Sequence, residues 1–123
     1  MLGKKQLVTF LATRDARRAV AFYRDKLGLR FVSQDQFAVV FNANGIMLRI
    51  QIVPNPTVAP YTALGWMVFS IVTTVKKLAK AGVVFERFPG MPQDDLGIWT
   101  SPSGARVAWF KDPDGHTLSL TQV

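Results

Sequence analysis

The stretch WFKDPDGHTLSL, residues 109–120, decides how the second half of this chain folds. Two β-type runs flank Asp-Pro-Asp-Gly, a tight-turn sequence, and together they predict a β-hairpin. An even-numbered loop pairs Lys111 with His116 across this turn. The same register pairs Phe110 with Thr117, Ala108 with Ser119, and Arg106 with Thr121.

Outward from this hairpin, the signals for strands and helices occur twice along the chain. Asp15 is the expected N-cap of a first helix that Gly28 ends, and Ser70 and Gly82 bound a second helix in the same way. The β-type runs are residues 6–11, 29–33, 37–42 and 46–53 in the first half, and 64–69, 83–88, 104–111 and 116–122 in the second. Each half is therefore predicted to be βαβββ.

The repeat is visible in the sequence itself. AVAFYRDKLGLRFV (19–32) and TVKKLAKAGVVFER (74–87) both run from a helix through a glycine into a strand. A four-stranded sheet alone would expose one face, so the two modules must pair or dimerise. We predict an α+β fold in one domain, residues 1–123, with a first module at 1–55 and a second at 62–123, joined by a proline-rich connector.

Composition narrows the classes of function. The 123 residues include no cysteine, which excludes disulfides, thiolate metal sites and thiolate nucleophiles. The net charge of +7 favours anionic small molecules, anionic surfaces or nucleic acid over cationic ligands. No apolar run has membrane-spanning length and the N-terminus lacks a cleavage-site pattern, so a cytoplasmic protein is expected.

Two segments carry a resemblance to a known family. DARRAVAFYRDKLGLRF (15–31) and VAWFKDPDGHTLSL (107–120) resemble the vicinal oxygen chelate superfamily, which includes glyoxalase I, fosfomycin- and bleomycin-resistance proteins and extradiol dioxygenases. The resemblance extends over essentially the whole chain. It implies two modules whose curved mixed sheets enclose a ligand cavity, with the helices outside, and it implies a homodimer.

The resemblance also implies four positions for the ligands of a divalent metal. They correspond to Val8, Arg49, Ala63 and Ser119 in this sequence. Divalent cations in proteins take carboxylate, imidazole or thiolate donors, and none of these four side chains has one. We therefore expect no metal and no other cofactor, which argues against the best-known chemistry of the family.

Strand alternation predicts what the ligand cavity contains instead. Ile46, Leu48 and Ile50 form an apolar core face, so the residues between them face the cavity. With the hairpin register above, the expected ligand-binding residues are Val8, Phe10, Met47, Arg49, Gln51, Arg106, Phe110, Thr117 and Ser119. Two arginines among apolar and hydroxyl groups suit a small, partly apolar organic anion. The alternative is that Arg49 and Arg106 reach solvent or pair with Asp94, Asp95 or Glu86.

Other polar and aromatic residues are assigned to structure. His116 is read as a surface histidine opening an edge strand in preference to a general acid or base. Tyr23 and Trp66 are expected on core-facing sides of their elements. Trp99 falls in the long loop 89–103, which is predicted to be either a lid or a dimer contact.

The resulting prediction is metal-independent binding of a small organic ligand, and the residues leave open whether it is turned over. One alternative is a glyoxalase-type lyase or isomerase, or a dioxygenase-like enzyme, that recruits a divalent metal through Gln51, Gln122 or His116 after a one-residue register shift. Another is an antibiotic-sequestering resistance protein. Nucleic acid is disfavoured, because the basic residues occupy the solvent faces of amphipathic helices. These residues are Arg14, Arg17, Arg18, Arg24, Lys26, Arg30, Lys76, Lys77 and Lys80.

Overall fold

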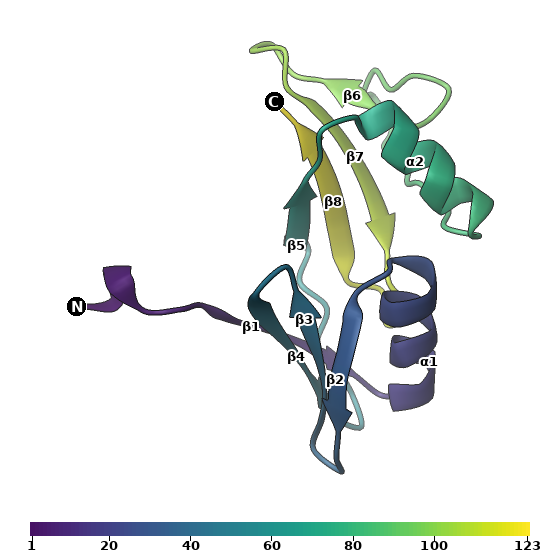
Figure 1. Ribbon diagram of the computed structural model, residues 1–123. Coiled ribbons are helices and arrows are strands. Elements are labelled where there is room, and N and C mark those ends of the chain that lie inside the picture. Colours follow the sequence, from purple (N-terminus) through teal and green to yellow (C-terminus); the bar gives the residue numbers. More distant parts are fainter. The chain divides into compact units, whose positions relative to one another are not determined.

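In the first half of the chain a single sheet is covered on one face by a helix. The structure, a computed structural model, describes all of residues 1–123 and divides into two units, Met1–Thr57 and Val58–Val123. The first unit contains η1 (Leu2–Lys4), β1 (Val8–Thr13), α1 (Ala16–Val20) with its continuation η2 (Ala21–Lys26), β2 (Arg30–Gln34), β3 (Ala38–Ala43) and β4 (Ile46–Ile52). Its strand order is β1-β4-β3-β2, with β1 parallel to β4 and the other neighbours antiparallel (Figure 1).

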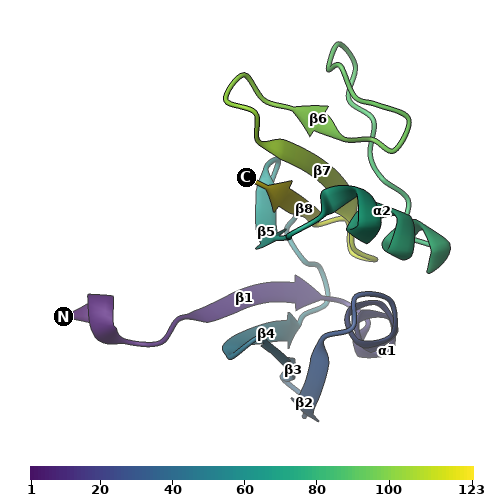
Figure 2. The same cartoon turned by 45° about the horizontal axis from the view of Figure 1, so that its top comes forward.

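The second unit repeats this arrangement. It contains β5 (Thr62–Met67), α2 (Ile71–Lys80), β6 (Trp99–Thr100), β7 (Arg106–Lys111) and β8 (Thr117–Gln122), in the sheet order β5-β8-β7-β6 (Figure 2). Asp15 accepts a hydrogen bond from the Arg18 backbone, and Ser70 accepts one from the Thr73 backbone. Both predicted N-caps are thus confirmed, as is the α+β fold of two βαβββ modules.

The core of each unit lies between its helix and its sheet. In the first unit Tyr23 is 1% exposed and packs between the rings of Phe22 and Phe41, with centroid distances of 5.1 and 5.9 Å. In the second unit Trp66 stacks on Phe110 at 6.4 Å. The predicted core positions of Tyr23 and Trp66 are confirmed. None of the helices has the length and apolar content that crossing a bilayer would require.

The second of the four strands predicted for the second half, residues 83–88, differs from its prediction. A continuous strand at 83–88 is wrong: only Phe85 forms a bridge, to Phe110, and β6 instead comes from the loop. The reason is that hydrogen bonds from side chains occupy backbone groups of this segment. The Gln93 amide donates to the carbonyls of Glu86 and Gly97, which removes the need for a regular ladder. Trp99 consequently belongs to a strand and not to a free loop.

The hairpin register also differs, by one residue. The Gly115 backbone donates to the Asp112 carbonyl at 3.0 Å, and Gly115 has a φ of 93°. A turn followed by a glycine in the left-handed region forms a bulge, which adds one residue to the loop. Lys111 therefore pairs with Thr117 instead of His116. The complete observed register is Arg106 with Gln122, Val107 with Thr121, Ala108 with Leu120, Trp109 with Ser119, and Phe110 with Leu118.

Candidate binding face

The sheet face of the first unit that its helix does not cover is mostly apolar. We call it the open face. The register of the sheet places on it Val8, Phe10 and Ala12 of β1, Met47, Arg49 and Gln51 of β4, and Ala38, Val40 and Asn42 of β3. Leu48 and Ile50, on the other face of β4, are each 1% exposed, whereas Met47 is 43% exposed. The alternation predicted for β4 is confirmed.

Arg49 occupies the middle of the open face. Its strand β4 lies between β1 and β3, so Phe10 is its neighbour on one side and Val40 on the other. Phe10 is 57% exposed and Val40 is buried, so the arginine stands beside a ring that solvent reaches. Arg49 is partly buried and forms no ion pair with a carboxylate. A charged fork in apolar surroundings without a fixed partner is suited to binding an anion.

The acidic group that acts on Arg49 is Asp35, and it is held by other contacts. Its carboxylate accepts backbone hydrogen bonds from Phe37 at 2.8 Å and Ala38 at 3.0 Å. These bonds lower the pKa of Asp35 from its ordinary value, and the attraction of Arg49 is a smaller cause. Asp35 therefore has its hydrogen-bond needs met within its own turn, which leaves the Arg49 fork available.

We expect the pKa of Asp35 to remain lowered in an Arg49→Ala variant, because the two backbone hydrogen bonds persist. Carbon-detected NMR titration of the carboxyl group measures this pKa directly. Since the folded-state pKa lies below the unfolded one, the carboxylate stabilises the fold above the unfolded value, and this stabilisation is lost as pH falls through the folded-state pKa. A return to the ordinary pKa in the variant would show that Arg49 is instead committed to Asp35.

A pocket of about 270 Å³ lies at the end of the open face where β1 begins, and Arg49 itself does not line it. It is lined by Gln6, Leu7, Val8, Val32, Val40, Phe41, Asn42, Gly45 and Met47. Val8 and Met47 are cross-strand partners. The next pair on the same face, Phe10 and Arg49, lies two residues further along the two strands. Two residues along a strand span about 7 Å, so a small organic molecule in the pocket would reach the arginine. The volume is close to the lower end of small-molecule sites, about 300 Å³.

The predicted ligand-binding residues of the second unit lie on two different faces of its sheet. Thr117 and Ser119 lie on the face that α2 does not cover, as expected. Ser119 is 8% exposed, pairs with Trp109, and has its hydroxyl over Gly65, where an added Cβ would come within 2.5 Å of the oxygen. Trp109 also contacts Trp99 at 6.1 Å. Thr117 pairs with Lys111, which forms an ion pair with Glu86 at 3.5 Å.

The face assignment of Arg106 and Phe110 is wrong. Because the Gly115 bulge shifts the register by one residue, both side chains lie on the side of β7 that packs against α2. Phe110 is fully buried, and Arg106 pairs with Asp94 at 4.0 Å, which is the predicted alternative for this arginine. Trp109 and Val107 take their places beside Ser119 and Thr121. The sequence contains a signal for this register shift, since Asp-Pro-Asp-Gly favours a turn with a glycine bulge.

The expectation for His116 is also corrected. It is 4% exposed and therefore not a surface histidine. Its backbone closes the turn, donating to the Asp112 carboxylate at 2.9 Å while its carbonyl accepts from the Asp112 backbone at 3.1 Å. Gln122, another candidate for recruiting a metal, accepts from the Ile71 backbone at the start of α2. Gln51 is exposed on the open face.

The four positions at which the family resemblance implies metal ligands do not fit a metal in this chain. Val8 and Ala63 have no donor atom, and Arg49 is cationic. Ser119 supplies one neutral hydroxyl beside Gly65. The neighbours of Val8 and Arg49 on the open face are apolar or amide side chains, and no cluster of three His, Cys, Asp or Glu side chains occurs in the structure. The donor chemistry that divalent cations need is therefore not assembled here.

Comparisons with known proteins agree on the family. The sequence profile of the Glyoxalase/Bleomycin resistance protein/Dioxygenase superfamily matches residues 5–120. Among solved structures, a superfamily member from Sphaerobacter thermophilus is 21% identical with a TM-score of 0.74, each chain being covered completely. Lactoylglutathione lyase from Agrobacterium tumefaciens is 18% identical with a TM-score of 0.73, over 97% of this chain and 93% of that one.

The fosfomycin resistance protein FosX from Listeria monocytogenes is 14% identical with a TM-score of 0.73, over 98% of this chain and 93% of that one. No curated protein matches the chain by sequence. At these identities the structural likeness concerns the fold and leaves the chemistry to the site residues.

Proposed function

We propose that this chain, which belongs to the Glyoxalase/Bleomycin resistance protein/Dioxygenase superfamily, binds a small, partly apolar organic anion on the open face without a metal. The observation that carries the proposal is Arg49, a partly buried arginine with no ion pair at the centre of a mostly apolar sheet face. An uncompensated charge in such a place has a desolvation cost, which an anionic ligand would offset.

The chemistry of the face suggests how such a ligand is held. The guanidinium of Arg49 offers two parallel N–H donors, a geometry that matches a carboxylate or a phosphate. Phe10 and Met47, both substantially exposed, provide apolar contact for the rest of the molecule. Gln51, also exposed on this face, can donate or accept a hydrogen bond. Specificity would then come from the anion, and affinity partly from the apolar body.

The donor chemistry of the face supports metal independence. Members of the superfamily include a lactoylglutathione lyase and a fosfomycin resistance protein, and such activities are a property of those proteins. In this chain a positive charge stands at Arg49, where the family resemblance implies a ligand of the cation. We propose that the arginine takes over the electrostatic part of the cation and binds the ligand's anionic group directly.

A thermal-shift series tests the proposal. We expect small carboxylates and phosphates with an apolar body to raise the midpoint, while neutral and cationic analogues of the same size do not. At a ligand concentration of 100 times Kd the stabilisation is about 2.7 kcal/mol. The Arg49→Ala variant should bind about tenfold or more weakly, since a charge-assisted hydrogen bond is lost. Arg49→Lys should recover part of the affinity, because it keeps the charge but not the fork.

The matched control is Lys77→Ala, which removes a positive charge from an exposed position on α2, outside the open face. Protein dialysed against a chelator and checked by elemental analysis should give the same shifts. Stabilisation by cationic compounds alone, an equal response from Arg49→Ala and the wild type, or a requirement for stoichiometric nickel, zinc or manganese would each contradict the proposal.

A further inference from the structure

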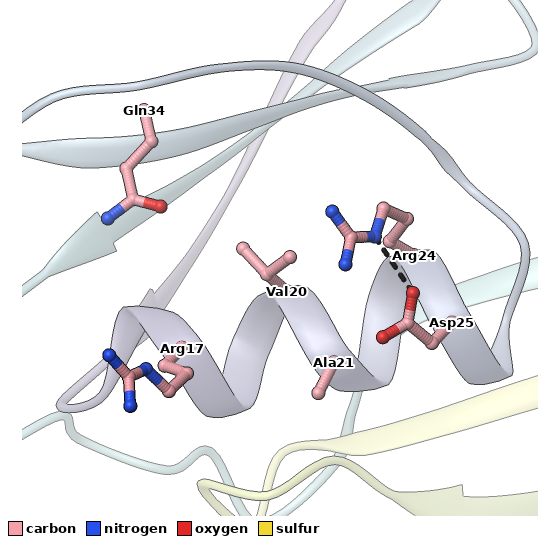
Figure 3. A pocket seen from close by; sticks show the side chains of 6 residues that line it. All are labelled: Arg17, Val20, Ala21, Arg24, Asp25 and Gln34. Carbon is pink, nitrogen blue, oxygen red and sulfur yellow. Dashed lines mark hydrogen bonds and ion pairs between the residues drawn. The ribbon is translucent and has the colours of Figure 1, made fainter.

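A second hollow lies on the helix side of the first unit, away from the open face. Its volume is about 470 Å³, and it lies between the helix formed by α1 and η2 and the strand β2 (Figure 3). The lining residues are Arg17, Val20, Ala21, Arg24, Asp25 and Gln34. We call it the helix groove. None of its residues belongs to the open face.

The helix groove combines two cationic groups with an apolar floor. Arg17, Val20, Ala21 and Arg24 follow one another at intervals of three, one and three residues, so they share one side of the helix. In Figure 3 the guanidinium groups of Arg17 and Arg24 lie on either side of Val20, and Gln34 lies across from them on β2. Seven residues of helix span about 10 Å, which leaves room for a short aliphatic chain between the two charges.

Several hydrogen-bond donors of the helix groove have no partner within the protein. Arg24 bonds Asp25 through Nε at 2.8 Å, which leaves its two terminal nitrogens for another partner. Arg17 forms no ion pair, and the Gln34 side chain forms no hydrogen bond with the protein. The groove therefore keeps a net positive charge and several free N–H donors beside Val20.

The backbone at the helix groove is unusual as well. η2 is a π-helix over Ala21–Lys26, with the Leu27 backbone donating to the carbonyl of Phe22, five residues earlier. Such segments are rare in proteins and occur often at functional sites. Arg24 and Asp25, which line the groove, both belong to this segment. Across it, all residues of β2 are exposed, since β2 is the edge strand of its sheet.

We propose that the helix groove is a second binding site, for a small organic anion made of a carboxylate or phosphate group on a short aliphatic chain. Arg17 binds the anionic group, the Gln34 amide donates a further hydrogen bond, and the charge of Arg24, on the other side of Val20, adds attraction for the anion. The aliphatic chain lies on Val20 and Ala21. The site differs from the open face in every residue, so it stands or fails independently of the function proposed above.

Titration of the ¹⁵N-labelled full chain with hexyl phosphate tests the proposal. We expect shifts concentrated in the backbone amides of Val20 and Ala21 and the side-chain amide of Gln34. Hexanol and hexylamine should produce none there, because each lacks the anion. The Arg17→Gln variant should weaken the binding read from these signals by about tenfold or more, as expected for a lost charge-assisted hydrogen bond.

Two variants distinguish binding in the helix groove from binding elsewhere on the chain. Arg30→Gln removes the same charge from β2 outside the groove, and Arg49→Ala removes the arginine of the open face. Both should leave the groove affinity within about twofold, because neither side chain lines it. Equal weakening by Arg17→Gln and Arg30→Gln would show nonspecific attraction to a basic protein and overturn the proposal. Shifts confined to the open face would overturn it as well.

Discussion

Replacing Phe110 by alanine is expected to lower the free energy of unfolding by about 3–5 kcal/mol, the range for a fully buried phenylalanine. The ring is 0% exposed, stacks on Trp66 at 6.4 Å, and meets Phe85 edge-on at 5.5 Å. Alanine would leave a cavity between β7 and α2 that the neighbouring rings cannot close. Had Phe110 faced a ligand cavity, as the even-loop register predicts, the same change would have altered binding more than stability.

Chemical denaturation measures this effect conveniently, because all three tryptophans lie in the second unit, at positions 66, 99 and 109. Their fluorescence therefore reports on the sheet that contains Phe110. Phe69→Ala is the matched control: Phe69 is 100% exposed, so its loss should change stability by less than about 0.5 kcal/mol. A change below about 1 kcal/mol for Phe110→Ala would contradict the observed hairpin register.

The second large effect is expected at Asp112, where alanine should lower the free energy of unfolding by about 2–4 kcal/mol. Its buried carboxylate accepts backbone hydrogen bonds from Asp114 at 3.0 Å and His116 at 2.9 Å. Alanine would leave both donors without this acceptor, the His116 donor in a buried position and the Asp114 donor in a partly buried one. The same turn sets the strand register through Gly115, so its loss would also loosen the pairing of β7 with β8.

A conservative variant distinguishes the hydrogen bonds from the charge. Asp112→Asn keeps an oxygen acceptor in the same place, so it should lose only about 1 kcal/mol. Asp95→Ala removes a carboxylate from an exposed loop position in the same unit and should change stability by less than about 0.5 kcal/mol. If Asp112→Asn were as damaging as Asp112→Ala, the negative charge and not the acceptor geometry would be responsible.

Half of the candidate site could be read from the sequence. For β4 the alternation of apolar and polar residues is complete, and it correctly places Met47, Arg49 and Gln51 opposite Leu48 and Ile50. For β7 the alternation is ambiguous, since Trp109 and Phe110 are both large and apolar. The prediction then depended on the turn, and one added residue at the glycine reversed the side assigned to the whole strand.

The sequence by itself determined the two βαβββ modules, the helix caps at Asp15 and Ser70, and the side of β4 on which Arg49 lies, because each depends on local periodicity or on contacts a few residues apart. Only the tertiary structure decided the partner of each β7 residue, the burial of His116, and the helix groove between η2 and β2. The β7 pairing depends on which of two local turn geometries forms at Gly115, whereas the burial of His116 and the helix groove depend on packing between segments that are apart in the chain. That balance of hydrogen bonds and packing is settled only when the elements meet.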